Sequence, residues 1–185
     1  MRSLIETERL CLGLPEPADA AAIATYYEKN RAHLQPWMPS WPSGFFTEEF
    51  WREQARSARQ DFRAVTAVRM IIALLAEPRR VIGNLSLTQI FRGPAHHCVM
   101  GYSLAEDAQG NGYMLEAVEG AVSYVFDELR MHRVSASYMP HNRRSAAVLR
   151  RAGFTVEGYA RDYIRIDGEW EDHIVTAIIN SGWSG

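Results

Sequence analysis

A short glycine-rich loop in front of a long apolar segment is the stretch of this chain whose spacing most clearly points to chemistry. Gly110 and Gly112 lie two residues apart in the segment EDAQGNGYM. Glycine adopts positive φ angles and lets the backbone approach a ligand closely. The free N–H groups of such a loop and of a following helical turn can converge on a phosphate, helped by the helix dipole. The pattern by itself therefore indicates either a tight connection between two elements, the more common case, or an anion-binding cradle.

The segments on either side of this loop predict the elements that would position it. Residues 99–104 have the apolar character of a strand. The residues after the loop carry apolar side chains at helical spacing, at Leu115, Val118, Val122, Val125, Phe126 and Leu129. The loop would therefore connect the end of a strand to the first turn of a helix.

Hydrophobic patterns predict further elements before this stretch. Residues 9–14 alternate leucines with other residues, which is typical of a half-buried strand. Residues 19–30 and 47–63 predict helices, the second capped by Thr47. Residues 65–76 and 81–90 predict an antiparallel hairpin with its turn at residues 77–79.

Three elements are expected after the long helix. Residues 133–139 predict a strand parallel to the one before the loop, because a helix connects the two. Residues 143–152 predict a helix with Asn142 as its cap and Gly153 just past its end. Residues 162–166 and 170–179 predict a hairpin around Asp167 and Gly168, a strong signal for a two-residue turn.

The segment HLQPWMPSWPSGFF, residues 33–46, combines prolines with tryptophans and phenylalanines. The prolines exclude a regular helix or a central strand. Aromatic side chains are costly to leave in water, so the segment must cover something. It is either a loop packed down as an extra layer of the core or a wall that lines a substrate site.

Length and composition fit a single domain over residues 1–185. A formal net charge of −2 gives no support for nucleic-acid or anionic-membrane binding. Cys11 and Cys98 lie far apart and match no metal spacing, so we expect reduced core cysteines and no metal. Without a signal peptide or a long apolar run, the chain is expected to be cytoplasmic.

Two motifs connect the glycine loop to a known family. Gln109, Gly112 and Met114 occupy the positions of a cofactor loop that reads Gln or Arg, two residues, Gly, one residue, then Gly or Ala; Met114 departs from the small last residue. The pattern NxRSxxxLxxxGF is formed by Asn142, Arg144, Ser145, Leu149, Gly153 and Phe154. With these motifs the chain resembles the GNAT superfamily of acetyl-CoA-dependent N-acetyltransferases.

Longer segments resemble one type within this superfamily, the RimJ-type ribosomal-protein-alanine N-acetyltransferases. The segments are TERL, NRAHLQPWMP, GYSL, HRVSASYMPHNRRS and GYARDYIRIDGEWEDHIVTA, and they span nearly the whole chain. The resemblance implies an α/β (α+β) GNAT fold, whose mixed sheet of about seven strands is splayed after the fourth strand and flanked by about four helices. It also implies acetyl-CoA as cosubstrate and the N-terminal alanine of a small-subunit ribosomal protein as acceptor, for a monomer or a homodimer.

The resemblance further implies where the cofactor lies. The diphosphate would rest on the loop residues Gln109, Gly110, Asn111, Gly112, Tyr113 and Met114. The pantetheine arm would bind the backbone of Tyr102, Ser103 and Leu104, where the two parallel strands separate. Asn142 would contact an amide of that arm or act as a plain helix cap, and both roles are compatible. Ser145 would donate a proton to the leaving thiolate.

The general base is the least determined residue. Because an α-amine has a reference pKa near 8, a carboxylate acting through water is sufficient. Glu116 is the first choice, since it lies one turn into the cofactor helix; Glu106 and Asp162 follow. The histidines that could also serve are His96, His97, His141 and His173.

The acceptor is expected to enter opposite the cofactor, between residues 37–41 and residues 159–163. Acidic residues near the last hairpin would favour a basic ribosomal partner, namely Asp162, Asp167, Glu169, Glu171 and Asp172. Two alternatives stay open: an acetyltransferase of a small-molecule amine such as a polyamine, an amino acid or an antibiotic, and a ribosome-assembly factor with a vestigial CoA site.

Overall fold

The computed structural model describes residues 1–184 and contains one mixed sheet of eight strands. The strands are β1 (Arg2–Glu6), β2 (Leu10–Leu14), β3 (Val68–Leu74), β4 (Glu77–Phe91), β5 (His97–Leu104), β6 (Arg133–Tyr138), β7 (Thr155–Ile166) and β8 (Glu169–Ile179). Their order is β1-β2-β3-β4-β5-β6-β8-β7. Neighbours pair antiparallel except β5 and β6, which are parallel as predicted.

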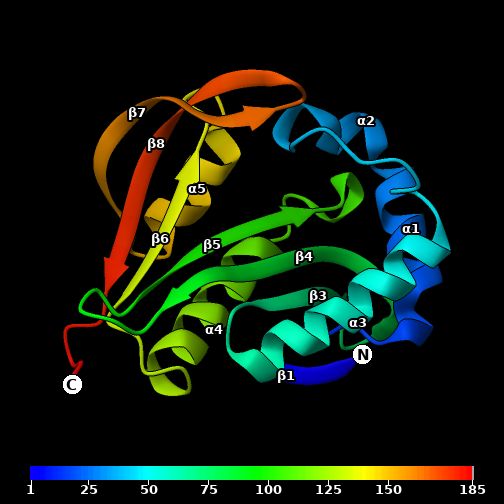
Figure 1. Ribbon diagram of the computed structural model, residues 1–185, viewed down its shortest axis with the longest axis horizontal. Coiled ribbons are helices and arrows are strands. Elements are labelled where there is room, and N and C mark those ends of the chain that lie inside the picture. The colour runs from blue at the N-terminus through cyan, green and yellow to red at the C-terminus, as the bar shows by residue number, and fades with distance from the viewer. Residues whose placement is uncertain (185) are drawn as a thin grey trace.

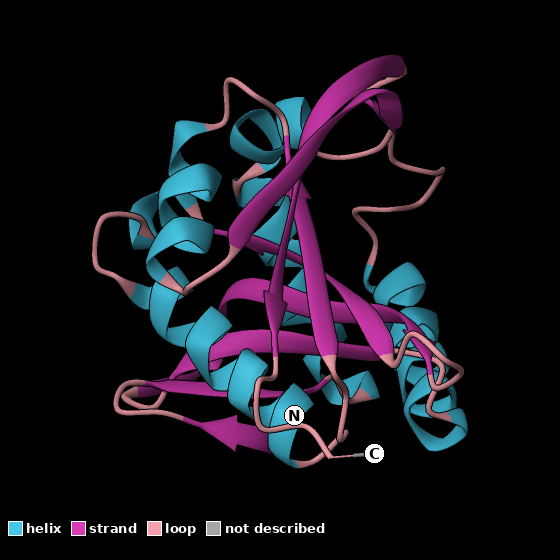
Figure 2. Cartoon of the chain, turned by 90° about the vertical axis from the view of Figure 1, so that its left-hand side faces the viewer, coloured by secondary structure: helices cyan, strands magenta, loops and turns pink. Residues whose placement is uncertain are grey.

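Helices cover both faces of this sheet (Figures 1 and 2). They are α1 (Ala20–Lys29), α2 (Arg31–Leu34), α3 (Glu48–Ala64), α4 (Tyr113–Asp127) and α5 (Arg143–Arg151). Helices α1 and α3 contact each other and the strands β2 to β4, whereas α4 contacts α5, β1 and β2. The fold class is therefore the predicted one, with one more strand than expected.

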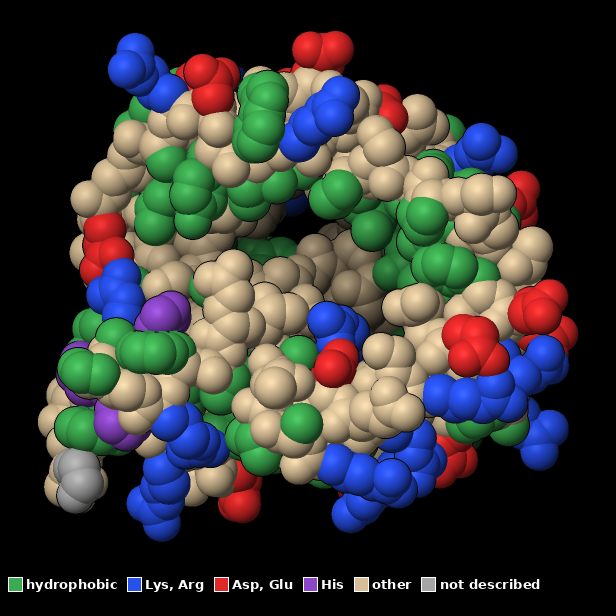
Figure 3. Space-filling view, in the orientation of Figure 1, with side chains coloured by type: hydrophobic (Ala, Val, Ile, Leu, Met, Phe, Trp, Pro, Cys, Tyr) green, Lys and Arg blue, Asp and Glu red, His purple; other side chains and the backbone are tan. Residues whose placement is uncertain are grey.

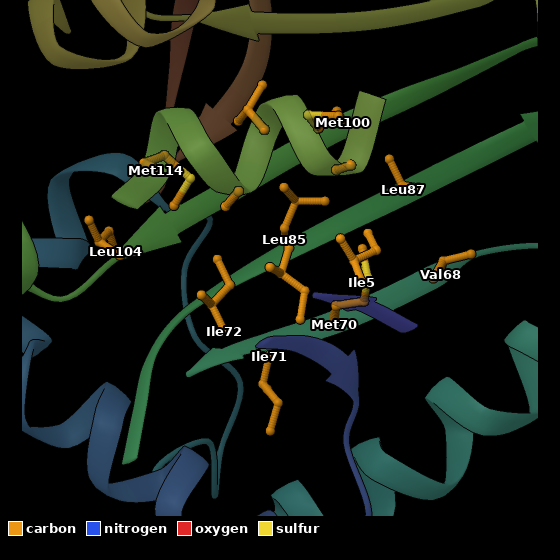
Figure 4. Packing of buried hydrophobic residues seen from close by; sticks show 14 of the residues in the cluster. Ile5, Val68, Met70, Ile71, Ile72, Leu85, Leu87, Met100, Leu104 and Met114 are labelled. Atoms are coloured by element: carbon orange, nitrogen blue, oxygen red, sulfur yellow. The ribbon is translucent and has the colours of Figure 1, made fainter. Parts of the chain in front are cut away.

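The core lies mainly between the sheet and α4. Figure 4 shows Leu85, Met100 and Met114 on this side of the sheet, while Ile71 points the other way. Helix α4 buries Met114, Ala117, Val118, Ala121, Val122 and Val125. Leu115 and Phe126, which the sequence placed on the buried face, are only partly buried.

The parallel strands β5 and β6 separate soon after they meet. Their pairing runs only from His97 opposite Arg133 to Val99 opposite Ser135. Strand β5 continues to Leu104 and β6 to Tyr138, and Figure 1 shows the two ribbons diverging. On its other edge β5 stays paired with β4 as far as Leu104. The backbone of residues 100–104 therefore has one edge free of β6, which confirms the predicted splay.

Most predicted elements are present, and the exceptions have clear causes. Strand β1 was missed because the segment RSLIE is short and has little periodicity. Strand β2 is buried along its whole length, not half-buried, because α3 and α4 cover its two faces. The turn of the β3–β4 hairpin lies at residues 75–76 instead of 77–79, since β4 already begins at Glu77. Asp167 and Gly168 form the predicted turn with φ values of 44° and 94°.

The aromatic segment at residues 33–46 takes the first of its two expected roles, a packed layer of the core. Phe45 is buried and packs against Tyr27, Trp41 and Trp51, so this part forms an extra core layer over α1 and α3. The stretch Gln35–Trp37 forms a 3-10 turn directly after α2. None of the helices in residues 1–184 has the length and apolar character needed to span a membrane.

Candidate active site

The splay between β5 and β6 opens into a cavity of about 630 Å³. Figure 3 shows the surface hollowed between the β7–β8 hairpin and β5. The cavity is lined by the end of β5, the glycine loop, the first turns of α4 and α5, and α2. The predicted residues that line it are Tyr102, Ser103, Leu104, Gln109, Gly110, Gly112, Tyr113, Met114, Asn142 and Ser145.

The glycine loop has the backbone geometry expected of an anion cradle. Gly110 and Gly112 have φ values of 80° and 81°, in the left-handed region that favours glycine. A Cβ atom built on Gly110 would meet no protein atom within 4 Å, so the space in front of this residue is open. Asn111 turns away from the cavity, and its side-chain amide donates to the carbonyl oxygens of Ala108 and Gln109. The loop is thus closed on itself and presents its backbone to the cavity.

Glu116, the first choice for the base, lies outside the cavity lining and binds the turn between β1 and β2. One carboxylate oxygen accepts from the Thr7 hydroxyl at 2.6 Å and from the Arg9 backbone N–H at 2.8 Å. The other accepts from the Arg9 side chain at 2.8 Å. Burial alone would raise the pKa of Glu116, but these hydrogen bonds outweigh it and lower the pKa. A carboxylate with a lowered pKa and several donors is a poor proton acceptor, so the geometry gives Glu116 a structural role.

Arg9 connects this ion pair to the glycine loop. Its Nη1 donates to the carbonyl oxygen of Asn111 at 3.0 Å, and its guanidinium lies over the Tyr113 ring, 4.7 Å from the centroid. The loop and the first turn of α4 are therefore held from outside by the β1–β2 turn, while their inner side faces the cavity.

Tyr102 and Ser145 face each other across the splay. The Tyr102 phenol on β5 lies 2.9 Å from the Ser145 hydroxyl at the start of α5. Burial raises the pKa of Tyr102 to about 12, partly offset by the hydrogen bond to Ser145, so the phenol is protonated at neutral pH. Asn142 is the predicted helix cap: its Oδ1 accepts from the Ser145 backbone N–H at 3.1 Å.

Ser103 belongs to a polar network behind the cavity wall. Its hydroxyl lies 2.8 Å from the Tyr26 hydroxyl and accepts from the Asn84 side chain at 2.6 Å. Asn84 also donates to the Tyr27 hydroxyl at 2.9 Å. Since burial raises the pKa of both tyrosines, the network is neutral and holds the end of β5 against β4 and α1.

His33 is a cavity residue that the sequence reasoning missed. One of its ring nitrogens, Nε2, lies 2.9 Å from Nε2 of Gln109, so α2 contacts the first residue of the cofactor loop. Trp37, one turn further along, also lines the cavity and packs on His141, with ring centroids 5.4 Å apart. The signal was available: His33 and Trp37 both lie in the segment NRAHLQPWMP that carries the family resemblance.

The remaining candidates for the base are dispersed. Glu106, in the short 3-10 turn after β5, lines the cavity, and its backbone N–H donates to Asn30 at 2.9 Å. Asp162 lies on β7 and does not line the cavity, and its backbone N–H donates to the Asp172 carboxylate. His173 is buried on β8. His96 packs on Trp183, and His97 packs on Phe91. None of these three histidines lines the cavity. Of the three carboxylates, Glu106 is the one that the cavity reaches.

The tip of the β7–β8 hairpin lies next to α2 and the residues that follow it (Figure 1). The backbone N–H of Asp167 donates to the Met38 carbonyl oxygen at 2.9 Å, and the Gln35 side chain donates to the Asp167 carboxylate at 3.1 Å. Of the two segments expected to admit the acceptor, residues 37–41 contribute Trp37 to the cavity lining, whereas residues 159–163 do not line it. Over residues 1–184 no three His, Cys, Asp or Glu side chains form a group that would hold a metal ion, and both cysteines are buried and free.

Comparison with known proteins decides the family. Residues 9–155 match the model of the acetyltransferase (GNAT) domain. The chain belongs to this family of acetyltransferases. The predicted enzyme class, an acetyl-CoA-dependent N-acetyltransferase, is thereby confirmed.

Relatives within the GNAT family cover nearly the whole chain. The [ribosomal protein uS5]-alanine N-acetyltransferase of Escherichia coli K12 is 36% identical, over 97% of this chain and 92% of its own. The crystal structure of the ribosomal-protein-S5-alanine acetyltransferase from Vibrio fischeri is 37% identical, with a TM-score of 0.93 over all of both chains. Mycobacterium smegmatis RimJ in complex with CoA-disulfide is 26% identical, with a TM-score of 0.88 over 95% of this chain and 84% of that one.

Proposed function

We propose that this GNAT enzyme transfers the acetyl group of acetyl-CoA to the N-terminal alanine amine of ribosomal protein uS5. One observation carries the proposal: the free edge of β5, the glycine loop and the Tyr102–Ser145 pair line the same cavity. The names of the Escherichia coli and Vibrio fischeri relatives, both similar over almost the full chain, support the acceptor.

The cavity suits acetyl-CoA because it offers backbone donors at both ends. Open space in front of Gly110 leaves room for the diphosphate on the loop N–H groups. The edge of residues 102–104 that no longer pairs with β6 can hold the pantetheine arm as an added strand. One N–H group of this edge would also stabilise the oxyanion that forms when the amine attacks the thioester carbonyl.

Side chains that line the cavity supply the proton transfers of the reaction. Ser145 would give a proton to the departing thiolate, and Asn142 would fix the backbone of Ser145 and contact the arm. Among the three carboxylates that the sequence put forward, we choose Glu106 as the group that takes the proton of the α-amine through water, because it lines the cavity. This choice replaces Glu116, whose carboxylate is occupied by Thr7 and Arg9.

The acceptor would enter beneath the tip of the β7–β8 hairpin, beside Trp37. Glu169 and Glu171 follow the turn of this hairpin, and with Asp162 and Asp172 they would attract a basic N-terminal segment. We further propose that residues 1–185 form a single domain and act in the cytoplasm, where ribosomal proteins are made.

The test uses purified small-subunit ribosomal proteins. They are incubated with the enzyme and acetyl-CoA, beside a panel of polyamines, amino acids and aminoglycosides, and are analysed by intact mass. One acetyl group on uS5 is expected, and Ser145→Ala should slow its addition about 100-fold with little change in the KM for acetyl-CoA. Turnover of small amines alone would assign the chain to the small-molecule acetyltransferases. CoA binding without any turnover would indicate a binding factor.

A further inference from the structure

Two hydroxyl groups meet at the point where the cavity lies between β5 and α5. Tyr102 and Ser145 belong to opposite walls, and their oxygen atoms are 2.9 Å apart. Among the side chains of residues 1–184, the Ser145 hydroxyl forms a hydrogen bond with the Tyr102 phenol. The next acceptor for the phenol is the Ser145 carbonyl oxygen, at 3.5 Å. Both contacts of the phenol are therefore made to the same residue.

The direction of the hydrogen bond decides which proton faces the cavity. Each hydroxyl carries one proton and can also accept. A phenol is a stronger acid than an alkyl alcohol, so the favoured arrangement has Tyr102 donating and Ser145 accepting. The Ser145 proton is then free to point into the cavity, where a sulphur atom would lie.

We propose that Tyr102 is a positioning residue for acetyl transfer, whose phenol donates to Ser145 and directs the Ser145 proton toward the leaving sulphur. The proposal rests on the proposed function. As the carbon–sulphur bond breaks, its electron pair stays on sulphur, which takes the Ser145 proton. The Ser145 oxygen takes the Tyr102 proton in the same step, and the phenol regains a proton from water after the thiol leaves.

A purely structural role for the phenol is disfavoured by the contacts around it. The start of α5 is already fixed by Asn142, which accepts from the Ser145 backbone N–H. The Tyr102 backbone is held on β5, where it pairs with Leu85 of β4. Removing the phenolic oxygen should therefore leave both walls of the cavity in place and change only the hydroxyl pair.

The experiment compares Tyr102→Phe, Ser145→Ala and the double variant with the unmodified enzyme. Tyr124→Phe is the matched control, because Tyr124 lies on α4 and lines no part of the cavity. Release of CoA is followed with a thiol reagent, with the uS5 N-terminal peptide and also without acceptor, when water takes the acetyl group. CoA affinity is measured separately by calorimetry.

Tyr102→Phe should lower kcat about tenfold, as expected for one lost hydrogen bond, and leave the Kd for CoA within about twofold. In the Ser145→Ala background the same change should have no further effect, because Tyr102 acts through Ser145. Losses that multiply in the double variant, an unchanged kcat, or a loss confined to CoA affinity would overturn the proposal. If the peptide is not acetylated, the proposed acceptor fails, while CoA release to water still tests Tyr102.

Discussion

Replacing Gly110 with alanine should weaken acetyl-CoA binding far more than it weakens the fold. The residue lines the cavity with a φ of 80°, and an added Cβ would meet no protein atom within 4 Å. The methyl group would therefore point into the space that the diphosphate is expected to fill.

The cost to the fold comes from backbone strain alone. An L-residue held in the left-handed region costs about 1–2 kcal/mol relative to glycine. For a chain of this size each kcal/mol lowers Tm by about 2–4 °C, so Tm should fall by about 2–8 °C.

The cost to binding comes from the hydrogen bonds that the methyl group prevents. A hydrogen bond to a charged group contributes about 1.5–3 kcal/mol. Losing one such bond between the loop and the diphosphate corresponds to a factor of roughly 10–150 in affinity. The KM for acetyl-CoA should therefore rise at least about tenfold, while kcat at saturation changes little.

Gly44→Ala provides the matched control. Gly44 has a φ of 78°, and a Cβ atom added there would lie 3.7 Å from the Thr47 hydroxyl, which is ordinary contact. An alanine at Gly44 would therefore carry the same backbone strain as one at Gly110, without a clash. It does not line the cavity. Both variants should lose similar Tm, measured by calorimetry, but only Gly110→Ala should change the KM for acetyl-CoA. Equal KM values in the two variants would refute the cradle.

Three further substitutions test other parts of the account. Glu116→Gln should lower Tm at pH 7. Folding lowers the pKa of the Glu116 carboxylate, so its ion pair stabilises the fold above the unfolded pKa, near 4.3. This stabilisation is lost as the pH falls through the folded pKa. The Tm difference from the unmodified chain should thus shrink between pH 5 and 3 in calorimetry, and a constant difference would contradict the ion-pair assignment. Gln35→Ala removes the side-chain hydrogen bond to Asp167 at the hairpin tip, and should raise the KM for the peptide acceptor a few-fold with the KM for acetyl-CoA unchanged. A raised KM for acetyl-CoA with an unchanged KM for the peptide, measured by steady-state kinetics, would place the acceptor elsewhere. Phe45→Ala should cost about 3–5 kcal/mol of unfolding free energy in urea titrations, since the ring is buried among aromatic neighbours, and a loss below 1 kcal/mol would show that this layer is not core.

Features that depend on neighbouring residues could be predicted from the sequence. Asp167 and Gly168 adopt positive φ because a two-residue hairpin turn requires it. Asn142 caps α5 because its side chain reaches an N–H group three residues ahead. The apolar spacing after the glycine loop identified α4, although the small residues Ala117 and Ala121 extend its buried face beyond the predicted leucines and valines.

Contacts between distant residues could not be predicted in the same way. Glu116 was chosen as base from its place on the helix, and its partners Thr7 and Arg9 lie more than a hundred residues earlier in the chain. The contact of His33 with Gln109 spans 76 residues, so no local pattern indicates it. Which polar groups share a cavity is decided by the packing of the sheet and helices.

The central claim is that the splay of β5 from β6 holds acetyl-CoA and delivers its acetyl group to a protein α-amine. The most direct measurement is kcat/KM for the uS5 N-terminal peptide, with fragmentation mass spectrometry to locate the acetyl group, beside the same peptide with a blocked α-amine. We expect acetylation at the alanine α-amine and no turnover of the blocked peptide. Acetylation of a lysine side chain, or equal turnover of the blocked peptide, would contradict it.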